Sequence, residues 1–203
     1  MTTPHERKIV LLGKEGVGKS TLIYRIRFGS FEGGREATIG AAFMSYKMID
    51  SQGNITPLHF WDTAGNERFT HLLPLYIRGA RVVLICFSDY SDLQTISKYV
   101  ENVLRVEAFA KIILVGMKVD LLSKEKSAWK DLLDVNLEEI PCQELREYAS
   151  SKEFPLFFTS SRTGQGVKKL MAHISSLFSE SSKIPEERVI LQSPESWTPK
   201  CCS

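Results

Sequence analysis

The amino-acid sequence predicts an α/β fold: a six-stranded, mostly parallel sheet with one antiparallel strand and helices on both faces. The first observation is a series of short apolar runs without polar alternation, which is typical of strands buried on both faces of a parallel sheet. The second is that segments with helical spacing lie between these runs, as β-α-β crossovers require. The expected parallel strands are Lys8–Leu12, Leu58–Trp61, Val82–Phe87, Ile112–Val115 and Leu156–Phe158.

The clearest helix is the last one, in which apolar residues recur at three and four positions. These residues are Val167, Leu170, Met171, Ile174, Leu177 and Phe178. The exception to the parallel pattern is the stretch Phe43–Asp62, whose halves meet at the turn-forming cluster Ser51–Asn54. This stretch predicts a hairpin that supplies the antiparallel strand.

The 203 residues and the formal net charge of +2 fit one ordinary domain, residues 1–178, and a flexible tail, residues 179–203. The balanced charge, without a basic stripe interleaved with aromatics, argues against nucleic-acid binding. No apolar run approaches the ~20 residues of a membrane-spanning helix, and the N-terminal residues do not resemble a secretory signal. The four cysteines lack metal-ligand spacing, so we expect a cytosolic protein. The charged insertion 123–141 has no clear period, and we assign it no function.

A glycine-rich motif, Gly13-Lys-Glu-Gly-Val-Gly-Lys19-Ser20, follows the first expected strand and opens a helical segment, Ser20–Phe28. This context is typical of a phosphate-binding loop, in which backbone N–H groups converge on phosphates and a helix N-terminus adds positive potential. Lys19 would reach the β- and γ-phosphates, and the hydroxyl of Ser20 would bind Mg²⁺. The alternative is a plain glycine turn with a solvated lysine.

A second motif, Asp62-Thr-Ala-Gly65, follows the expected strand Leu58–Trp61. A carboxylate at this point can reach Mg²⁺ through water, and the N–H group of Gly65 can meet a γ-phosphate. Such a tetrad can also form a plain turn. Its place behind a phosphate loop favours the functional interpretation.

These motifs, with three further ones, resemble those of Ras-like GTPases, the small G domains of the P-loop NTPases. The further ones are Thr38, Lys118-Val-Asp120 and Ser160-Ser-Arg162. Within that superfamily, Trp61–Phe69 and Tyr76–Ala80 resemble Rab signatures, and Ala37–Phe43 resembles the early-endosomal Rab subgroup. The likeness spans about residues 7–178.

The resemblance implies a GTPase that binds GTP or GDP with Mg²⁺. Ser20, Thr38 and Asp62 would form the Mg²⁺ site, and Thr38 would also sense the γ-phosphate from switch I. Asp120 would accept hydrogen bonds from guanine N1 and N2 and so select GTP over ATP, because a buried carboxylate without such donors is left unpaired. Lys118 would lie over the base.

The resemblance also assigns further contacts. The expected nucleotide contacts are Gly13, Glu15, Gly16, Val17, Gly18, Lys19, Ser20, Thr21, Phe31, Thr38, Gly65, Lys118, Asp120, Ser160, Ser161 and Arg162. The expected catalytic residues are Asn66, Lys19, Thr38 and Gly65. The trio that matches the effector-binding aromatics of Rab proteins is Phe43, Trp61 and Tyr76, for which a place in the ordinary core is the alternative.

Two residues depart from the family pattern near the γ-phosphate. Asn66 replaces the glutamine that orients the attacking water and is one methylene shorter. Because a misplacement of about 1 Å can cost ~10²-fold in rate, we expect slow intrinsic hydrolysis. Glu15 occupies a loop position usually held by a small residue, where its carboxylate would oppose the γ-phosphate and an incoming arginine.

A third departure lies in the base-binding motif. Met117 replaces the asparagine that normally precedes Lys118, binds the base and ties two loops together. A lost hydrogen bond costs about 0.5–1.5 kcal/mol, so we expect nucleotide affinity to be ~10-fold weaker, with faster exchange. Asp120 is present, so guanine selectivity should survive.

The terminal sequence Lys200-Cys-Cys-Ser203 does not fit the C-a-a-X motif. It resembles the ends of Rab proteins that receive two geranylgeranyl groups, on Cys201 and Cys202. Two lipid chains give stable anchoring, whereas one gives marginal attachment. The alternative is a pair of spare surface thiols.

The expected function is therefore a membrane-anchored GTPase switch in vesicle trafficking, on the cytoplasmic face of early endosomes, with a cytosolic pool. Its expected partners are an exchange factor, a GTPase-activating protein, effectors through switches I and II, Rab escort protein, geranylgeranyltransferase and GDP dissociation inhibitor. A GTP-held membrane adaptor with little or no hydrolysis is the alternative. An ATP-using P-loop kinase is disfavoured, because it leaves Lys118-Val-Asp120 unexplained.

Overall fold

The computed structural model describes residues 7–34, 36–49, 55–122 and 142–179. In chain order the elements are β1 (Lys8–Leu12), α1 (Lys19–Phe28), β2 (Ala41–Ile49), β3 (Ile55–Thr63), a 3₁₀ turn (Glu67–Leu72), α2 (Leu73–Ile77), β4 (Val82–Phe87), α3 (Leu93–Val106), β5 (Lys111–Gly116), a second 3₁₀ turn (Val119–Leu121), α4 (Gln143–Ser151), β6 (Leu156–Phe158) and α5 (Val167–Ser179). Within these described ranges, no helix combines the length and the apolar character that crossing a bilayer requires.

The six strands form one sheet in the order β2-β3-β1-β4-β5-β6. All neighbouring strands are parallel except β2 and β3, which pair antiparallel with Phe43 opposite Trp61. The predicted mixed sheet and its hairpin strand are therefore confirmed. The hairpin turn at 51–54, the insertion at 123–141 and the tail beyond Ser179 lie outside the described residues.

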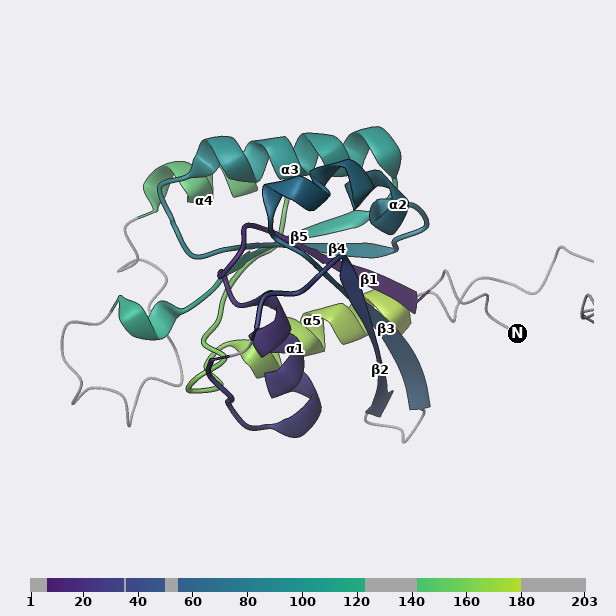
Figure 1. Cartoon of the computed structure of the whole chain (residues 1–203). Coiled ribbons are helices and arrows are strands. Elements are labelled where there is room, and N and C mark those ends of the chain that lie inside the picture. Colours follow the sequence, from purple (N-terminus) through teal and green to yellow (C-terminus); the bar gives the residue numbers. More distant parts are fainter. Residues whose placement is uncertain (1–6, 35, 50–54, 123–141, 180–203) are drawn as a thin grey trace, which may run out of the picture.

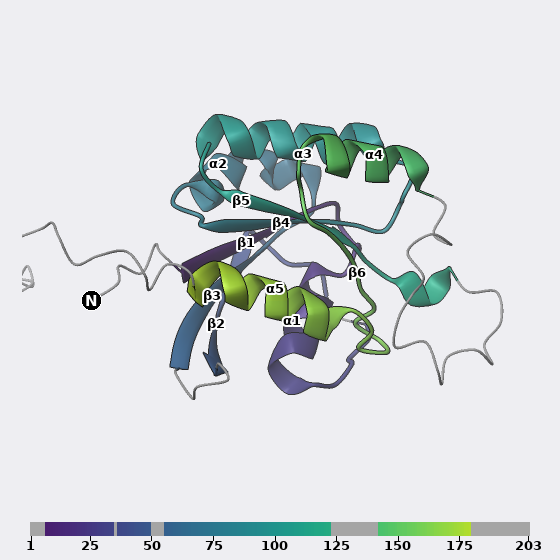
Figure 2. The same cartoon turned by 180° about the vertical axis from the view of Figure 1, so that it is seen from behind.

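Helices cover both faces of the sheet, as Figures 1 and 2 show from opposite sides. One face carries α2, α3 and α4, whose buried residues, such as Ile77, Val100 and Leu145, pack against β1, β4 and β5. The other face carries α1 and α5, which contribute Leu22 and Ile174 to a second apolar cluster. Burial on both faces explains why β1 and β4 are apolar at nearly every position.

The parallel strands all end at the same edge of the sheet, and the predicted motifs follow those ends. The loop after β1 leads into α1, Asp62 is the residue before the last in β3, and Lys118 and Ser160 come shortly after β5 and β6. In open α/β sheets, ligands bind outside the carboxyl ends of the strands. The topology therefore brings the candidate site residues together at this edge.

Candidate functional site: a nucleotide cavity at the carboxyl edge of the sheet

A cavity of about 540 Å³ lies at this edge. It is lined by the glycine-rich loop, the start of α1, residues of the segment 31–38, Gly65 and Asn66, residues 117–121 without Val119, and Ser161 with Arg162. These segments come from five separate loops of the chain. The volume suits a ligand of the size of a nucleotide.

The glycine-rich loop has a backbone that other residues rarely adopt. Gly16 and Gly18 have φ angles of 75° and 107°, and Gly18 directly precedes α1. Gly13 approaches β4 so closely that an added Cβ would lie 2.1 Å from the carbonyl oxygen of Cys86. Glycine is required where φ is positive or where backbones approach this closely.

The ammonium group of Lys19 is enclosed by this loop. Its Nζ donates to the carbonyl oxygens of Gly13 at 2.7 Å and of Lys14 at 3.0 Å, and only 6% of the residue is exposed. Burial lowers the pKa of Lys19 below its ordinary value of 10.5, while Asp62 and Glu15 act in the opposite direction. A desolvated cation at a helix N-terminus is an arrangement that phosphate complements.

Three oxygen-bearing side chains meet beside Lys19. Ser20 Oγ lies 3.0 Å from Thr38 Oγ1, and Thr38 Oγ1 donates to Asp62 Oδ2 at 3.4 Å. Hydroxyl and carboxylate oxygens are ligands suited to Mg²⁺, which keeps several waters and binds to few protein groups. Elsewhere in the described part of the chain, no group of three or more His, Cys, Asp or Glu side chains could hold a metal ion. The donor set of Ser20, Thr38 and Asp62 therefore fits Mg²⁺ beside a phosphate.

The segment after β3 packs against the glycine-rich loop. A Cβ added to Gly65 would lie 2.3 Å from Glu15 N and 2.5 Å from the carbonyl oxygen of Lys14. The next residue, Asn66, donates from Nδ2 to Glu15 Oε2 at 2.9 Å. Its Oδ1 accepts from the backbone N–H of Arg68 at 3.1 Å and so caps the 3₁₀ turn. The two expected departures from the family pattern, Glu15 and Asn66, are thus in contact.

The other end of the cavity is formed by the loops after β5 and β6. Lys118, with a left-handed φ of 58°, and Asp120 line the cavity. Asp120 Oδ1 accepts from Ser160 Oγ at 2.6 Å, which orients the carboxylate. Arg25 of α1 holds the next loop from behind, donating from Nε to Ser161 O at 2.6 Å and from Nη2 to Arg162 O at 2.5 Å.

The structure brings almost all the expected nucleotide contacts to one cavity, including Thr21 and the half-exposed Phe31. Of the described residues, two expected contacts do not line it. Gly13 acts through its carbonyl oxygen on Lys19, and Ser160 is fully buried behind Asp120. Both therefore support residues of the cavity wall.

The aromatic trio forms a continuous surface beside the cavity. The ring centroids of Phe43 and Trp61 are 5.5 Å apart, and those of Trp61 and Tyr76 are 6.4 Å apart. Phe43 is 57% exposed, which a residue of the ordinary core would not be. Trp61 and Tyr76 are partly buried and pack against the core below them. The three rings from β2, β3 and α2 thus offer an apolar face to solvent.

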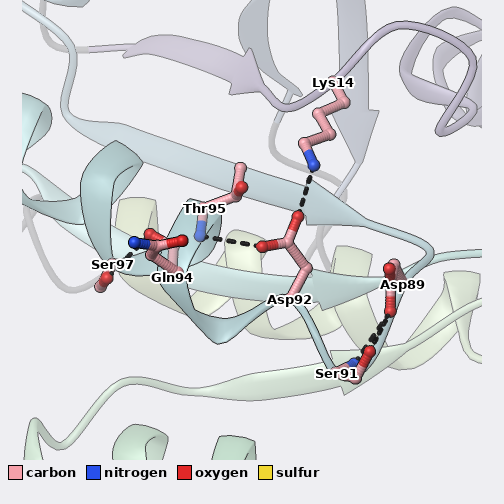
Figure 3. Close-up of polar contacts among 7 residues, drawn as sticks. All are labelled: Lys14, Asp89, Ser91, Asp92, Gln94, Thr95 and Ser97. Atoms are coloured by element: carbon pink, nitrogen blue, oxygen red, sulfur yellow. Dashed lines mark hydrogen bonds and ion pairs between the residues drawn. The ribbon is translucent and has the colours of Figure 1, made fainter.

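Three polar contacts of the site have no signal in the sequence. Arg25 reaches the loop after β6, Lys14 forms an ion pair with Asp92, and Tyr90 donates to the carbonyl oxygen of Met117. The second of these is drawn in Figure 3. Each joins a residue in or beside a recognised motif to one that lies outside the motifs and far away in the chain, so local spacing does not reveal them.

Comparison with known proteins places this site in a family. The model of the Ras family matches residues 8–179. The chain is 32% identical over 171 residues to the Ras-related protein Rab-5A of Dictyostelium discoideum, covering 83% of this chain and 78% of that protein. It is 29% identical over 185 residues to the GTP-binding protein ypt5 of Schizosaccharomyces pombe, covering 90% of this chain and 82% of that protein. The chain therefore belongs to the Ras family, in its Rab branch, and is a small GTPase that binds GTP and GDP.

Proposed function

We propose that this GTPase is a slowly hydrolysing, membrane-anchored switch in vesicle trafficking, acting on early endocytic membranes. The observation that carries the slow hydrolysis is the state of the Asn66 amide. Its donor end binds Glu15 and its acceptor end binds the N–H of Arg68. These two contacts fix the orientation of the amide, so turning it toward an attacking water molecule would break one of them.

The nucleotide would lie with its phosphates on the glycine-rich loop and its base between the loops after β5 and β6. Lys19 would move from its carbonyl partners to the β- and γ-phosphates, and the N–H of Gly65 would meet the γ-phosphate. Asp120, held by Ser160, would accept hydrogen bonds from the guanine N1 and N2 groups. Phe31 and Lys118, on the cavity wall, would flank the base.

The residues Ser20, Thr38 and Asp62 would hold Mg²⁺ beside the γ-phosphate. When bound, the ion neutralises charge that develops on the phosphate oxygens. Thr38 would couple the conformation of switch I, to which it belongs, to the γ-phosphate and Mg²⁺, because its hydroxyl contacts both Ser20 and Asp62. Switch I around Thr38 and switch II over residues 66–76 would be the elements that change on hydrolysis.

The partners of this switch would be an exchange factor, a GTPase-activating protein and effectors. The face formed by Phe43, Trp61 and Tyr76 supports effector binding, since aromatic side chains dominate interface energies. Lipids on Cys201 and Cys202, which lie outside the described residues, would anchor the protein. The proposed lipid anchor implies three further partners: Rab escort protein, geranylgeranyltransferase and GDP dissociation inhibitor.

The contact between Asn66 and Glu15 also favours a second candidate, a membrane adaptor held in its GTP state. Single-turnover hydrolysis of bound GTP tests both. We expect a rate modestly below that of Asn66→Gln, whose side chain reaches one methylene further. Hydrolysis too slow to measure, with GTP in the purified protein, would support the adaptor. Equal rates for the wild type and Asn66→Gln would contradict the slow-hydrolysis proposal.

Removal of Mg²⁺ tests the metal site separately. Chelation with EDTA should accelerate the release of GDP from the wild type, because phosphate charge is then less well neutralised. Ser20→Ala should release GDP rapidly with or without EDTA. A wild-type release rate that does not respond to EDTA would contradict Mg²⁺ binding at Ser20, Thr38 and Asp62.

A further inference from the structure

The loop between β4 and α3, residues 88–92, contacts both ends of the nucleotide site. At one end, Lys14 Nζ of the phosphate loop lies 2.5 Å from Asp92 Oδ2. At the other, Tyr90 Oη donates to the carbonyl oxygen of Met117 at 2.6 Å, directly before Lys118. Figure 3 shows the side chain of Lys14 reaching down to Asp92. One short loop therefore has a polar contact with each of two loops that line the cavity.

This loop is itself well held. Asp92 Oδ1 accepts from Thr95 N at 3.1 Å and caps α3, so the carboxylate binds Lys14 and the helix at once. Asp89 Oδ1 accepts from the backbone N–H and the hydroxyl of Ser91, at 3.0 and 2.7 Å. Both sets of contacts are drawn in Figure 3. These local contacts hold the loop at Asp89, Ser91 and Asp92.

Tyr90 is fixed by packing as well as by its hydrogen bond. Its ring centroid lies 5.8 Å from those of Phe87 and of Phe158. A Cβ on Gly116 would lie 2.8 Å from Tyr90 Cε1 and 2.6 Å from Phe158 Cδ1, so the two rings fill the space over that glycine. Burial raises the pKa of the Tyr90 hydroxyl, which therefore stays protonated and able to donate.

The side chain of Met117 is buried in the apolar cluster that α1 and α5 share with the sheet, and its polar contact in the same region is weak. A Cβ added to Gly18 of the phosphate loop would lie 3.5 Å from the Cε of Met117. Its Sδ accepts from Thr159 Oγ1 at 3.4 Å, and thioether sulfur is a weak acceptor. Two strong hydrogen bonds hold the backbone of Met117. Its N–H donates to the carbonyl oxygen of Phe87 in β4 at 2.7 Å, and its carbonyl oxygen accepts from Tyr90, in the loop 88–92, at 2.6 Å.

We propose that residues 88–92 brace the guanine-binding loop against the phosphate loop, and that Tyr90 and Asp92 are positioning residues that slow nucleotide release. The inference rests on the proposed placement of the guanine base beside Lys118 and Asp120. Neither Tyr90 nor Asp92 contacts the nucleotide in this arrangement. They act by holding the phosphate loop and the guanine-binding loop at the distance from each other that a bound nucleotide requires.

The test is the release of a fluorescent GDP derivative in excess GTP, for the full chain with Mg²⁺. Tyr90→Phe keeps the ring and removes one buried donor, and should accelerate release about 3- to 10-fold. Asp92→Asn keeps a good helix cap but loses the charge opposite Lys14, and should accelerate release about 2-fold. That smaller effect should disappear at about 1 M salt, where exposed ion pairs are screened. Ser91→Ala, which alters only a contact within the loop, is the matched control and should release GDP at the wild-type rate.

Two further readouts separate positioning from a general loss of structure. The single-turnover rate of bound GTP should change less than about 2-fold in Tyr90→Phe, because the γ-phosphate lies at the other end of the site. The double variant should release GDP little faster than Tyr90→Phe alone, since one broken end already releases the brace. The proposal would be overturned if Tyr90→Phe released GDP at the wild-type rate. It would also be overturned if the accelerations of the two single variants multiplied in the double variant. Failure of the wild type to bind GDP would instead overturn the proposed function.

Discussion

The side-chain amide of Asn66 and the carboxylate of Glu15 are joined by a hydrogen bond of 2.9 Å between Nδ2 and Oε2. The two residues are 51 positions apart in the chain and come from switch II and the phosphate loop. In the slow hydrolysis that we propose, each would lower the rate by itself, Asn66 through its short reach and Glu15 through its charge. Their contact makes them a single unit, so their effects on the rate should not be independent.

A double-substitution cycle should show this coupling. Asn66→Gln alone should raise the single-turnover rate modestly, because Glu15 can still accept a hydrogen bond from the longer amide. Glu15→Gly frees the amide and removes the opposing charge, and with Asn66→Gln it should raise the rate by ~10²-fold or more. The gain from Asn66→Gln should therefore be larger in the Glu15→Gly background. An equal gain in both backgrounds would contradict the coupling.

Gly65 should not tolerate alanine. The added Cβ would lie 2.3 Å from Glu15 N and 2.5 Å from the carbonyl oxygen of Lys14, both backbone atoms that cannot swing away. The segment that carries Asn66 must then move from the phosphate loop. We expect Gly65→Ala to hydrolyse bound GTP ~10²-fold more slowly in single turnover, while GDP release changes only a few-fold. If Gly65→Ala hydrolyses GTP at the wild-type rate, Gly65 does not stay against the phosphate loop when GTP is bound.

The sequence predicted which residues line the cavity more accurately than it predicted where each strand and helix begins and ends. Lys8–Leu12 and Val82–Phe87 begin and end as expected, because burial on both faces makes these strands apolar throughout. The expected strand Leu58–Trp61 is in fact Ile55–Thr63, since pairing with β2 continues over Ile55–Pro57 at one end and over the buried polar residues Asp62 and Thr63 at the other. Helix α1 begins one residue earlier than expected, at Lys19.

The recognised motifs predicted which residues line the cavity, because each follows a strand at the same edge of the sheet. They could not predict contacts between motif and non-motif residues. Lys14 meets Asp92 across 78 positions and Tyr90 meets Met117 across 27. Such pairs depend on how α3 and the sheet pack, which no local spacing encodes. For the same reason, the contact of Glu15 with Asn66 was not expected, although both residues were singled out.

Nucleotide binding should be linked to proton uptake at Lys19. Burial lowers the pKa of the nucleotide-free ammonium below 10.5. Below this lowered pKa the lysine is charged in both the folded and the unfolded chain, so burial of its charge destabilises the fold by the full desolvation cost. This destabilisation decreases as the pH rises through the lowered pKa, because the folded chain then loses the proton. Phosphate should raise the pKa again, so GDP binds with uptake of a proton between the two values.

Calorimetry at a series of pH values up to 10.5, in two buffers with different enthalpies of ionisation, measures this uptake. The affinity for GDP should fall as the pH rises through the same window. Lys19→Gln should bind GDP weakly and without the uptake. A proton balance that is the same in Lys19→Gln and in the wild type would assign the uptake to another group.

Met117→Asn should lower the stability of the protein and raise its affinity for the nucleotide. Met117 is 1% exposed and belongs to the apolar cluster between the sheet, α1 and α5. Asparagine would lose this packing and should lower the free energy of unfolding of the nucleotide-free protein by about 2 kcal/mol or more in urea denaturation. Its amide would add hydrogen bonds at the base, as in Ras-like relatives, and should slow GDP release about 10-fold. Met117→Leu, which conserves volume, should lower stability by less than about 1.5 kcal/mol. If Met117→Asn loses stability without slowing release, the absent asparagine is not what limits nucleotide affinity in this chain.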